Sequence, residues 1–383
     1  MRIAIDIRKI GRRQTGDETY ITNLIKNLAR LDQKNQYFLC TDCFEGEAIA
    51  KKILQDLPEN FRINYITPGH KMFWTFYALP KFLKAKKIDL VHVQYITPLV
   101  LPTSTKLITT IHDVSFKVHP GYLKKSDQML LNFFIPKSLK KANHIITVSK
   151  FTKKQITNFF PKVASQKITT IYNGIKDKIF GPKEQFDSDK IQTVRNKYNL
   201  KTSYILNVGS LQPRKNIPAL IKAFRQYLTL YPDSDTVLAL AGEKGYHYDY
   251  RINRCLRDLV LRKRVRLLGY VKEQDLPILY AAASLYASPS IYEGFNLPLV
   301  EVMKSAVPII ASDLSCHGEI INQAGILVDP FDTQTFAQQI HKVLTNKKIR
   351  QNLIQKGLKR SDKFNWQTCA KKTLAVYRQV AST

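Results

Sequence analysis

The sequence contains no run of eighteen or more apolar residues and very little cysteine. The first absence predicts that the chain has no membrane-spanning helix. The cysteines are scattered, and only Cys40 and Cys43 form a C-x-x-C pair. A zinc site would need a second pair, and a redox site would need the pair at a helix N-terminus after a strand. We therefore interpret Cys40 and Cys43 as small residues near a strand end, with a functional pair as the alternative.

Several signatures of nucleotide and metal binding are also missing. The chain has neither a P-loop nor a complete G-x-G-x-x-G motif. No cluster of His, Cys and Asp has the spacing of metal ligands. Two D-x-D segments, Asp187 to Asp189 and Asp233 to Asp235, lie in polar loop sequence, where turn and capping roles are expected. The sequence thus predicts no metal site and no bound cofactor.

The length and composition indicate a soluble protein of two ordinary domains. The chain has 383 residues, of which 44% are hydrophobic, enough for two buried cores. An alternating strand begins almost at residue 1, so we expect no signal peptide and a cytoplasmic location.

The formal net charge of +30 is shared by both halves of the chain rather than held in a tail. Such a field attracts phosphates, nucleic acid or an anionic membrane surface. The basic residues are dispersed, and no helix-turn-helix, RNA-binding or zinc motif is present. Nucleic-acid binding therefore stays as a lesser alternative, and we expect no specific nucleic-acid partner.

Strand-like runs alternate with longer amphipathic stretches along the whole chain, the pattern of doubly wound α/β domains. In the first half the expected strands are 2–7, 36–40, 62–66, 89–93, 106–112 and 144–148. In the second half they are 203–209, 236–241, 264–268, 283–287, 307–311 and 325–328. A polar stretch at about 173–201 is the expected linker. Two such domains would face a central cleft, where ligands bind at the carboxyl ends of the strands.

The most informative motif is the segment from Glu293 to Glu301, which reads EGFNLPLVE. Pro298 suits the first turn of a helix, so the three residues after Glu293 form a loop at the start of that helix. Backbone N–H groups at such a place bind an anion. Carboxylates on either side of a bound phosphate could accept hydrogen bonds from sugar hydroxyls. The alternative is a capped helix with solvated glutamates.

Two further motifs also follow expected strands. The run NVGSLQPRKN, residues 207–216, places Arg214 and Lys215 just before a helix, where both side chains suit a diphosphate. The pair His112-Asp113 closes a hydrophobic strand, so His112 could donate to a sugar hydroxyl, and Asp113 could orient His112 or contact the acceptor. A strand-end cap is the alternative for this pair. Gly16 lies between the first strand and a helix and would let backbone approach a phosphate.

These motifs, in this order, resemble the family 4 retaining glycosyltransferases of the GT-B fold, and the NVGSLQPRKN run resembles mannosyltransferase-like members. The resemblance runs from the first strand to Trp366. It implies two Rossmann-like domains, an acceptor-binding domain at 1–180 and a donor-binding domain at 181–367, with a helix at about 368–383 packing back on the first. The sequence departs from the family pattern at Asn296, where glycine is frequent. It also departs at Asp17 and Glu18, which lie beside the expected diphosphate site.

The resemblance also implies roles for individual residues. The implied catalytic residues are His112, Asp113, Arg214, Lys215 and Glu293. The implied donor-binding residues are Gly16, Ser210, Tyr270, Val271, Gly294, Phe295, Asn296, Leu297 and Glu301. The expected reaction is metal-independent transfer of a hexose, with mannose favoured, from a nucleotide sugar to a glycan or lipid-linked acceptor in cell-surface polysaccharide synthesis. GDP-mannose is the favoured donor and a UDP-sugar the alternative, while an epimerase or phosphorylase on the same fold is the alternative enzyme.

Aromatic residues stand beside lysines in two segments of the first half, from Met72 to Lys87 and from Tyr122 to Lys141. This pattern is the basis for expecting peripheral contact with an anionic membrane, at its inner face, next to a lipid-linked acceptor. The alternative is an ordinary helix with its apolar residues in a core and its lysines in water.

Overall fold

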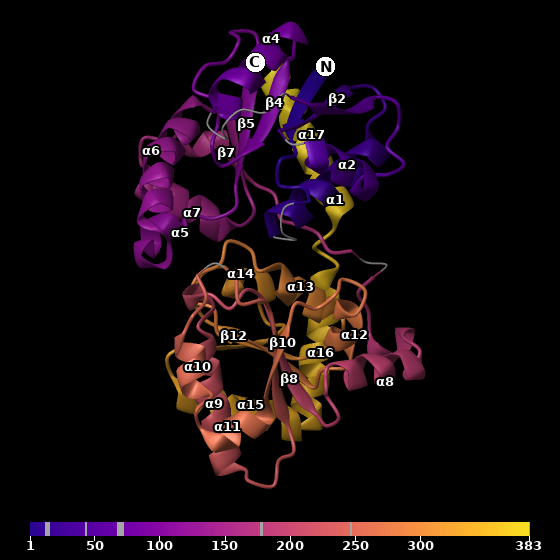
Figure 1. Ribbon diagram of the computed structural model, residues 1–383, viewed down its shortest axis with the longest axis vertical. Helices are drawn as coiled ribbons and strands as arrows, with labels where there is room; N and C mark the ends of the chain where they lie inside the picture. Colours follow the sequence, from indigo (N-terminus) through magenta and orange to yellow (C-terminus); the bar gives the residue numbers. More distant parts are fainter. Residues whose placement is uncertain (12–15, 43, 67–72, 177–178, 246, 383) are drawn as a thin grey trace. The chain divides into compact units, whose positions relative to one another are not determined.

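The computed structural model describes residues 1–11, 16–42, 44–66, 73–176, 179–245 and 247–382. The chain divides into two compact units. Unit 1 comprises Met1–Gly174 and Asn365–Thr383, and unit 2 comprises Ile175–Phe364. In each unit helices cover both faces of a central sheet (Figure 1).

Unit 1 is built on a parallel sheet of seven strands in the order β3-β2-β1-β4-β5-β6-β7. Its strands are β1 (Arg2–Asp6), β2 (Gln36–Thr41), β3 (Phe61–Tyr65), β4 (Leu90–Gln94), β5 (Lys106–Ile111), β6 (His144–Thr147) and β7 (Ile168–Thr170). Its longer helices are α1 (Gly16–Leu31), α2 (Phe44–Ile53), α4 (Leu79–Ala85), α6 (Lys125–Lys141), α7 (Lys150–Phe159) and α17 (Trp366–Ala381). Shorter helical turns are η1 (Trp74–Ala78), α5 (Ser115–Val118), η2 (Pro120–Tyr122) and η3 (Ser165–Lys167).

Unit 2 is built on a parallel sheet of six strands in the order β10-β9-β8-β11-β12-β13. Its strands are β8 (Tyr204–Val208), β9 (Val237–Ala241), β10 (Val265–Gly269), β11 (Leu285–Ser288), β12 (Ile309–Ser312) and β13 (Ile326–Val328). Its longer helices are α8 (Ser188–Lys197), α9 (Ile217–Leu230), α13 (Leu297–Lys304), α15 (Thr333–Thr345) and α16 (Lys347–Ser361). Shorter ones are η4 (Lys183–Gln185), η5 (Pro213–Lys215), α10 (Arg251–Cys255), α11 (Leu259–Arg264), α12 (Leu276–Ala281) and α14 (His317–Ile321).

Both sheets reverse their winding direction once. In unit 1 the reversal lies between β1 and β4, and in unit 2 it lies between β8 and β11. Loops that leave the carboxyl ends of two such strands diverge to opposite faces, which opens a crevice for a ligand. In unit 2 those loops carry the NVGSLQPRKN and EGFNLPLVE motifs.

Polar residues fix the starts of several helices. The side chains of Ser149, Asp187, Asp332 and Asn365 accept hydrogen bonds from backbone N–H groups in the first turns of α7, α8, α15 and α17. These N–H groups have no partner within the helix, so the caps satisfy them. The capping role of Asp187 confirms the interpretation of the first D-x-D segment as local structure.

The last helix, α17, packs against α1 in unit 1 (Figure 1). A buried network ties it to the sheet. His92 on β4 lies 2.6 Å from the Tyr377 hydroxyl on α17 and 2.8 Å from Oγ1 of Thr110 on β5. The hydroxyl of Tyr20 on α1 lies 3.0 Å from the same Thr110 oxygen. The final segment of the chain is therefore part of the core of unit 1.

The α/β class and the two Rossmann-like sheets are confirmed, and the twelve expected strands all correspond to strands of the structure. One strand was missed. β7 has only three residues, Ile168–Thr170, and lies at the edge of its sheet. Such a segment is too short to show an alternating pattern.

The expected linker at 173–201 is wrong as a description of the whole stretch. It contains η4 and the ten-residue helix α8, whose Ile191 and Val194 are buried. The boundaries of the units, 174/175 and 364/365, also differ from the expected 180/181 and 367/368. The N–H of Ile175 donates to the carbonyl of Phe364, and the ring of Phe180 packs on Tyr280 of α12. These contacts join Ile175 and Phe180 to unit 2.

Three further expectations concern the cysteine pair, the segment that begins at Met72 and membrane-spanning helices. Cys43 and Met72 lie outside the described residues. Cys40 is a buried residue of β2. None of the described helices combines the length and the apolar character that a membrane span requires.

Gly174 provides a test of the packing at the start of α17. A Cβ at this position would stand 2.1 Å from the backbone nitrogen of Trp366. Because backbone cannot yield like a flexible side chain, Gly174→Ala should destabilise the protein by about 1–3 kcal/mol. Thermal unfolding of the full chain should show a midpoint several degrees lower.

Gly121→Ala is the matched control, since no atom lies within 4 Å of where its Cβ would stand. Equal midpoints for Gly174→Ala, Gly121→Ala and the unaltered protein would contradict the packing of α17 described above.

Candidate functional site

Backbone approaches backbone closely at the carboxyl ends of the first strands of unit 2. The N–H of Gly209, just after β8, donates to the carbonyl of Ala241 on β9. A Cβ on Gly242 would stand 1.9 Å from the Gly209 carbonyl oxygen. Only glycine fits at position 242, and the loops after β8 and β9 lie in contact as a result.

The loop after β8 is bound to the loop after β11, across the point where the sheet reverses. The N–H of Ile291 donates to the carbonyl of Arg214 at 2.8 Å. The Arg214 guanidinium donates in return to the carbonyl of Tyr292, at 3.2 Å. Asn216, which has a left-handed backbone conformation, donates from its side chain to the carbonyl of Pro330. The two motif-bearing loops form one structure.

A buried ion cluster lies at the centre of this structure. Oε2 of Glu293 is 2.7 Å from NH1 of Arg214, and Oε1 contacts the ammonium of Lys215. Glu293 is only 6% exposed. Burial raises the pKa of Glu293, but Arg214 and Lys215 outweigh it and lower the pKa to about 2. Glu293 is therefore ionised at every physiological pH, and three predicted site residues are brought together.

Lys215 responds to the same surroundings. Burial lowers the pKa of its ammonium and the nearby Arg214 lowers it further, while Glu293 raises it. The Lys215 side chain also passes over Gly209, where a Cβ would stand 3.3 Å from its Nζ. Two partly buried cations beside one buried carboxylate leave an excess of positive charge at this place. Such an arrangement is suited to an additional anion.

The turn before α13 is held by Asn296 together with His317, a residue that the sequence motifs did not indicate. Asn296 has a left-handed backbone conformation, with φ of 64°, which asparagine tolerates better than most residues. This explains why asparagine can stand where glycine is frequent. Its side-chain amide lies 2.9 Å from Nε2 of His317 and 3.2 Å from Oγ of Ser288. The Asn296 side chain therefore points into the unit. It does not cover the backbone N–H groups at the start of the helix.

The position of His317 defines its tautomer. Nδ1 lies 3.1 Å from the carbonyl of Ser312, so Nδ1 carries the proton and Nε2 accepts from Asn296. Burial lowers the pKa of His317 to about 4, which keeps the ring neutral. Nearby, Ser315 accepts a hydrogen bond from the N–H of Glu293. The polar run SDLSCH after β12 was the sequence signal for these two residues.

Glu301 lies one turn into α13, where the hydroxyl of Tyr280 on α12 donates to its Oε2 at 3.0 Å. Burial raises the pKa of Glu301 to about 7, an effect that Tyr280 and Lys176 oppose. The pKa values of the two glutamates of one motif are thus shifted in opposite directions. Tyr280 is a second residue that the sequence did not indicate, because it lies on a separate helix.

The remaining predicted donor-binding residues of unit 2 lie in the loops after β8, β10 and β11 and at the start of α13. Ser210 and Tyr270 are exposed and follow the ends of β8 and β10, and Val271 is partly exposed. Gly294 and Phe295 are buried in the loop before α13, where the Phe295 ring meets Phe364 edge to face. Leu297 is the first residue of α13.

The predicted residues of unit 1 form a separate polar group. His112, which directly follows β5, is buried, and its Nε2 lies 2.7 Å from Oε1 of Gln94 and 3.9 Å from Oδ1 of Asp17. The ring of Tyr20 meets it edge to face. Burial lowers the pKa of His112, while Asp17 and Asp113 raise it. A neutral imidazole surrounded by hydrogen-bonding groups can position a hydroxyl.

Asp113 and the residues near Gly16 have local partners. Oδ1 of Asp113 accepts from the N–H of Ser115, the strand-end cap that was the alternative for this residue. Gly16 is exposed at the first position of α1. Asp17 pairs with Lys9 at 3.5 Å, and Glu18 accepts from the N–H of Gly11 at 2.7 Å. Both acidic side chains near Gly16 are therefore occupied within unit 1.

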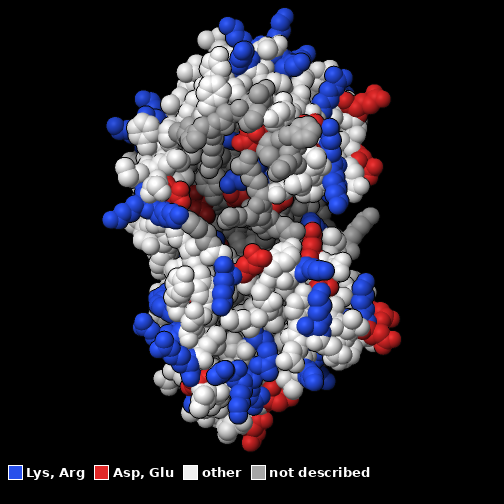
Figure 2. All heavy atoms as spheres, viewed as in Figure 1, with Lys and Arg blue, Asp and Glu red and all other residues white. Residues whose placement is uncertain are grey.

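The described residues contain no candidate metal centre. Among the residues that the structure describes, no group of three or more His, Cys, Asp and Glu side chains could hold a metal ion. Lys and Arg side chains lie over much of the visible face of each unit (Figure 2).

Family models match both halves of the chain. A model described as Glycosyl transferases group 1 matches residues 189–360, and one described as Glycosyltransferase Family 4 matches residues 15–178. The chain is 33% identical to the O-antigen chain mannosyltransferase B of Escherichia coli over 278 residues, which cover 71% of this chain and 70% of the relative. It is 28% identical to the O-antigen chain mannosyltransferase RfbU of Salmonella typhimurium, with 63% and 62% covered.

Solved structures share the fold over the whole length. Sucrose-phosphate synthase from Thermosynechococcus elongatus superposes with a TM-score of 0.76 at 20% identity, and 100% of this chain and 99% of that chain are covered. HepE from Anabaena, in complex with UDP and glucose, superposes with a TM-score of 0.74 at 17% identity, with 99% and 100% covered.

The pKa of Glu301 leads to a pH-dependent contribution to stability. Its folded-state pKa of about 7 lies above the ordinary value of 4.5, so the folded state binds the proton more tightly than the unfolded state. Stability from this group is therefore present at low pH and is lost as pH rises towards 7. Relative to Glu301→Gln, the unaltered protein should lose about 2–3 kcal/mol between pH 5 and pH 8.

The measurement is the difference in thermal stability between the two proteins across that pH range. Tyr280→Phe should enlarge the effect, because the Tyr280 hydroxyl stabilises the ionised form. A difference that does not change with pH would show that Glu301 titrates normally.

Proposed function

This chain belongs to the group 1 glycosyltransferases of the GT-B fold, and from that premise we propose that it transfers a hexose from a nucleotide sugar to a glycan or lipid-linked acceptor. Mannose is the favoured sugar, because the relatives above are O-antigen mannosyltransferases. GDP-mannose is then the favoured donor. A UDP-sugar is the alternative, because HepE has been crystallised with UDP and glucose. Cell-surface polysaccharide synthesis is the process that these relatives suggest.

The observation that carries the proposal is the Glu293 cluster at the point where the sheet of unit 2 reverses. Arg214 and Lys215 are held together there beside one carboxylate, with a pKa of about 2 for Glu293. A sugar diphosphate brings both kinds of group that this cluster can bind. Its phosphates suit the two cations, and its hexose hydroxyls can donate to an ionised carboxylate.

The proposed reaction retains the configuration of the sugar. The bond between the sugar C1 and the diphosphate oxygen breaks while the acceptor oxygen bonds to C1 from the same face. The acceptor's proton passes to an oxygen of the leaving diphosphate. Arg214 and Lys215 stabilise the negative charge that develops on this leaving group, which is the task a metal ion performs in other transferases. We therefore propose that the reaction needs no metal.

Different residues are assigned to the ribose, the base and the transferred sugar of the donor. Glu301 accepts hydrogen bonds from the ribose, and backbone at Tyr270 and Val271 meets the base. In unit 1, His112 contacts the transferred sugar near its reacting carbon. Asp113 acts through its charge on His112, since its Oδ1 already caps the turn at Ser115.

The proposed membrane contact is on unit 1. One face of α6 exposes residues spaced four apart, with Lys125, Met129, Phe133 and Lys137 in succession. Met129 is 73% exposed and Phe133 is 55% exposed, and the Lys137 ammonium lies 3.4 Å from the centroid of the Phe133 ring. Large exposed apolar groups next to cations suit the surface of an anionic bilayer.

A second element extends this face. The ring of Phe134 on α6 stacks on Phe76 of η1, with centroids 5.1 Å apart. η1 and the residue before it expose Tyr77 and Phe73, by 54% and 48%. The aromatic residues of the two elements therefore form one continuous surface, which we call the α6–η1 face.

Alanine substitutions test the donor assignments. Glu293→Ala should lower kcat/KM by about a thousandfold, because it leaves Arg214 and Lys215 without the carboxylate that positions them. Glu301→Ala should instead raise the donor dissociation constant by about 10- to 100-fold through lost ribose hydrogen bonds. Transfer of radiolabelled mannose from GDP-mannose, measured in EDTA, and donor binding by calorimetry separate the two effects.

Glu184→Ala is the control, since Glu184 is an exposed residue of η4. Full activity in Glu293→Ala or Glu301→Ala would refute the corresponding assignment. Loss of wild-type activity in EDTA would refute the metal-independent mechanism, and hydrolysis or isomerisation of the donor without acceptor would favour another enzyme on this fold.

Vesicles test the α6–η1 face. The double variant Met129→Ser/Phe133→Ser should bind vesicles of phosphatidylglycerol about tenfold more weakly at low salt, since two apolar side chains no longer enter the bilayer. Co-sedimentation is the measurement. The control, Tyr250→Ser/Leu259→Ser, removes two residues of unit 2 that are 77% and 74% exposed. Equal binding by both variants would exclude this face as the contact.

A further inference from the structure

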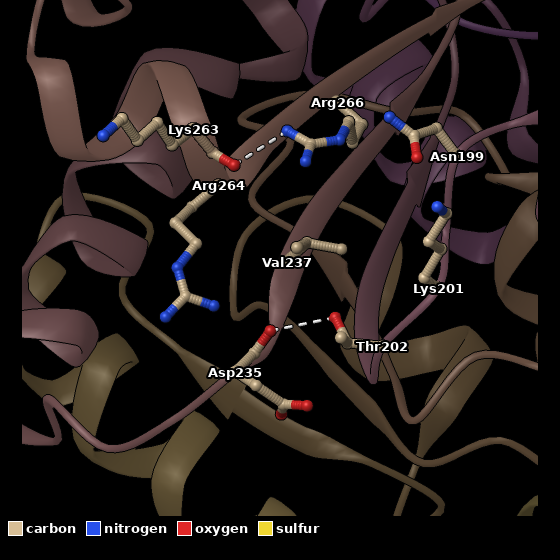
Figure 3. A pocket seen from close by; sticks show the side chains of 8 residues that line it. All are labelled: Asn199, Lys201, Thr202, Asp235, Val237, Lys263, Arg264 and Arg266. Carbon is tan, nitrogen blue, oxygen red and sulfur yellow. Dashed lines mark hydrogen bonds between the residues drawn. The ribbon is translucent and has the colours of Figure 1, made fainter.

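A basic hollow lies at the opposite end of the unit 2 sheet from the Glu293 cluster. It has a volume of 280 Å³ and is formed by the segments just before β8, β9 and β10. Figure 3 shows its side chains arranged around Val237, with Lys201 on one side, Arg264 on the other and Arg266 above. Because β8 has five residues, this hollow and the Arg214 loop are separated by about 15 Å of strand.

The three segments that form the hollow are fixed to one another. Thr202 donates from its hydroxyl to the carbonyl of Asp235 at 2.9 Å (Figure 3). Arg264 donates to the carbonyl of Ser234 at 2.7 Å. Arg266 donates to the carbonyl of Lys263 at 2.9 Å. The hollow is therefore a built feature with a rigid rim.

A further arginine stabilises the wall from outside the hollow. The guanidinium of Arg195 on α8 donates to three successive carbonyls, those of Leu200, Lys201 and Thr202, at 2.9–3.1 Å. These bonds fix the backbone that carries Lys201. They also place a fifth positive charge behind the wall.

The charges of the hollow are not balanced. Lys201, Lys263, Arg264 and Arg266 line it, with Asp235 as the one carboxylate among the lining residues. No ion pair is formed by these four cations among the described residues. Elsewhere in unit 2, Arg225 forms an ion pair with Asp258 at 2.9 Å, and Arg251 forms one with Asp249 at 2.8 Å.

One hydrogen-bond donor of Arg266 has no partner among the described residues. Its NH1 group donates to backbone carbonyls, but its Nε is buried without a hydrogen-bond partner in the described part of the chain. Unmatched donors of a guanidinium, together with uncompensated charge, are characteristic of sites that bind phosphate oxygens.

We propose that this hollow is a second anion-binding site, which takes a small ligand with at least two linked phosphates. The excess of three positive charges favours several negative charges on one short ligand. The volume is below that of most sites for drug-sized molecules, about 300 Å³, so a small anion fits better than a nucleotide or a macromolecule. The site is independent of the proposed sugar transfer.

Inorganic pyrophosphate is the probe, titrated calorimetrically into the full chain. The double variant Lys201→Gln/Lys263→Gln should lose one binding event or weaken it at least about tenfold. Both side chains are exposed, so the variant should keep its thermal midpoint. Asp235→Asn should tighten the same event several-fold, because it removes the only lining carboxylate.

Two controls separate this site from the rest of the molecule. Lys356→Gln/Lys359→Gln removes the same charge from exposed positions on α16 and should bind as the unaltered protein does. Arg214→Gln alters the Glu293 cluster and should keep the event that Lys201→Gln/Lys263→Gln loses. The proposal is overturned if Lys201→Gln/Lys263→Gln matches its lysine control, if Asp235→Asn binds no tighter, or if orthophosphate binds as well as pyrophosphate.

Discussion

The ion cluster of Glu293 with Arg214 and Lys215 is the interaction on which the candidate site of unit 2 depends. The three residues come from loops that follow β8 and β11, which are neighbours only because the sheet reverses its winding there. Backbone hydrogen bonds between the same loops hold the charges at fixed positions. Burial makes the charges costly unless they are paired, so the cluster both joins the loops and leaves one positive charge in excess for a ligand.

The other half of the site depends on hydrogen bonds rather than charge. A left-handed Asn296 lets the chain turn sharply into α13, and the neutral His317 fixes the side chain of that asparagine. The backbone at the helix start is thereby left for an anion. One turn later, Tyr280 holds Glu301 in surroundings that raise its pKa to about 7. Two carboxylates of a nine-residue motif thus differ because their neighbours differ.

The two ends of the unit 2 sheet make a physical contrast. At the carboxyl ends of the strands, two partly buried cations share one buried carboxylate, which fixes their positions. At the amino ends, cations are held by backbone carbonyls and have no acidic partner among the described residues. Unit 2 therefore holds its positive charge in two arrangements. One group of cations is paired with a carboxylate, and the other is held only by backbone carbonyls, and both can attract phosphate.

Most of the helices and strands, and most of the motif residues, could be predicted from the sequence. Strand positions follow from alternation over a few neighbouring residues, a local property, and the places of Arg214, Lys215 and Glu293 after strands follow from that order. The sequence did not indicate β7, which is too short, or α8, whose polar surface resembles a linker. Only the tertiary structure decided which distant residues meet. His317 and Tyr280 act on Asn296 and Glu301 across gaps of about twenty residues, and Asp113 turned out to cap a turn. The protonation states were decided there too, because a pKa depends on burial and neighbours that no linear pattern contains.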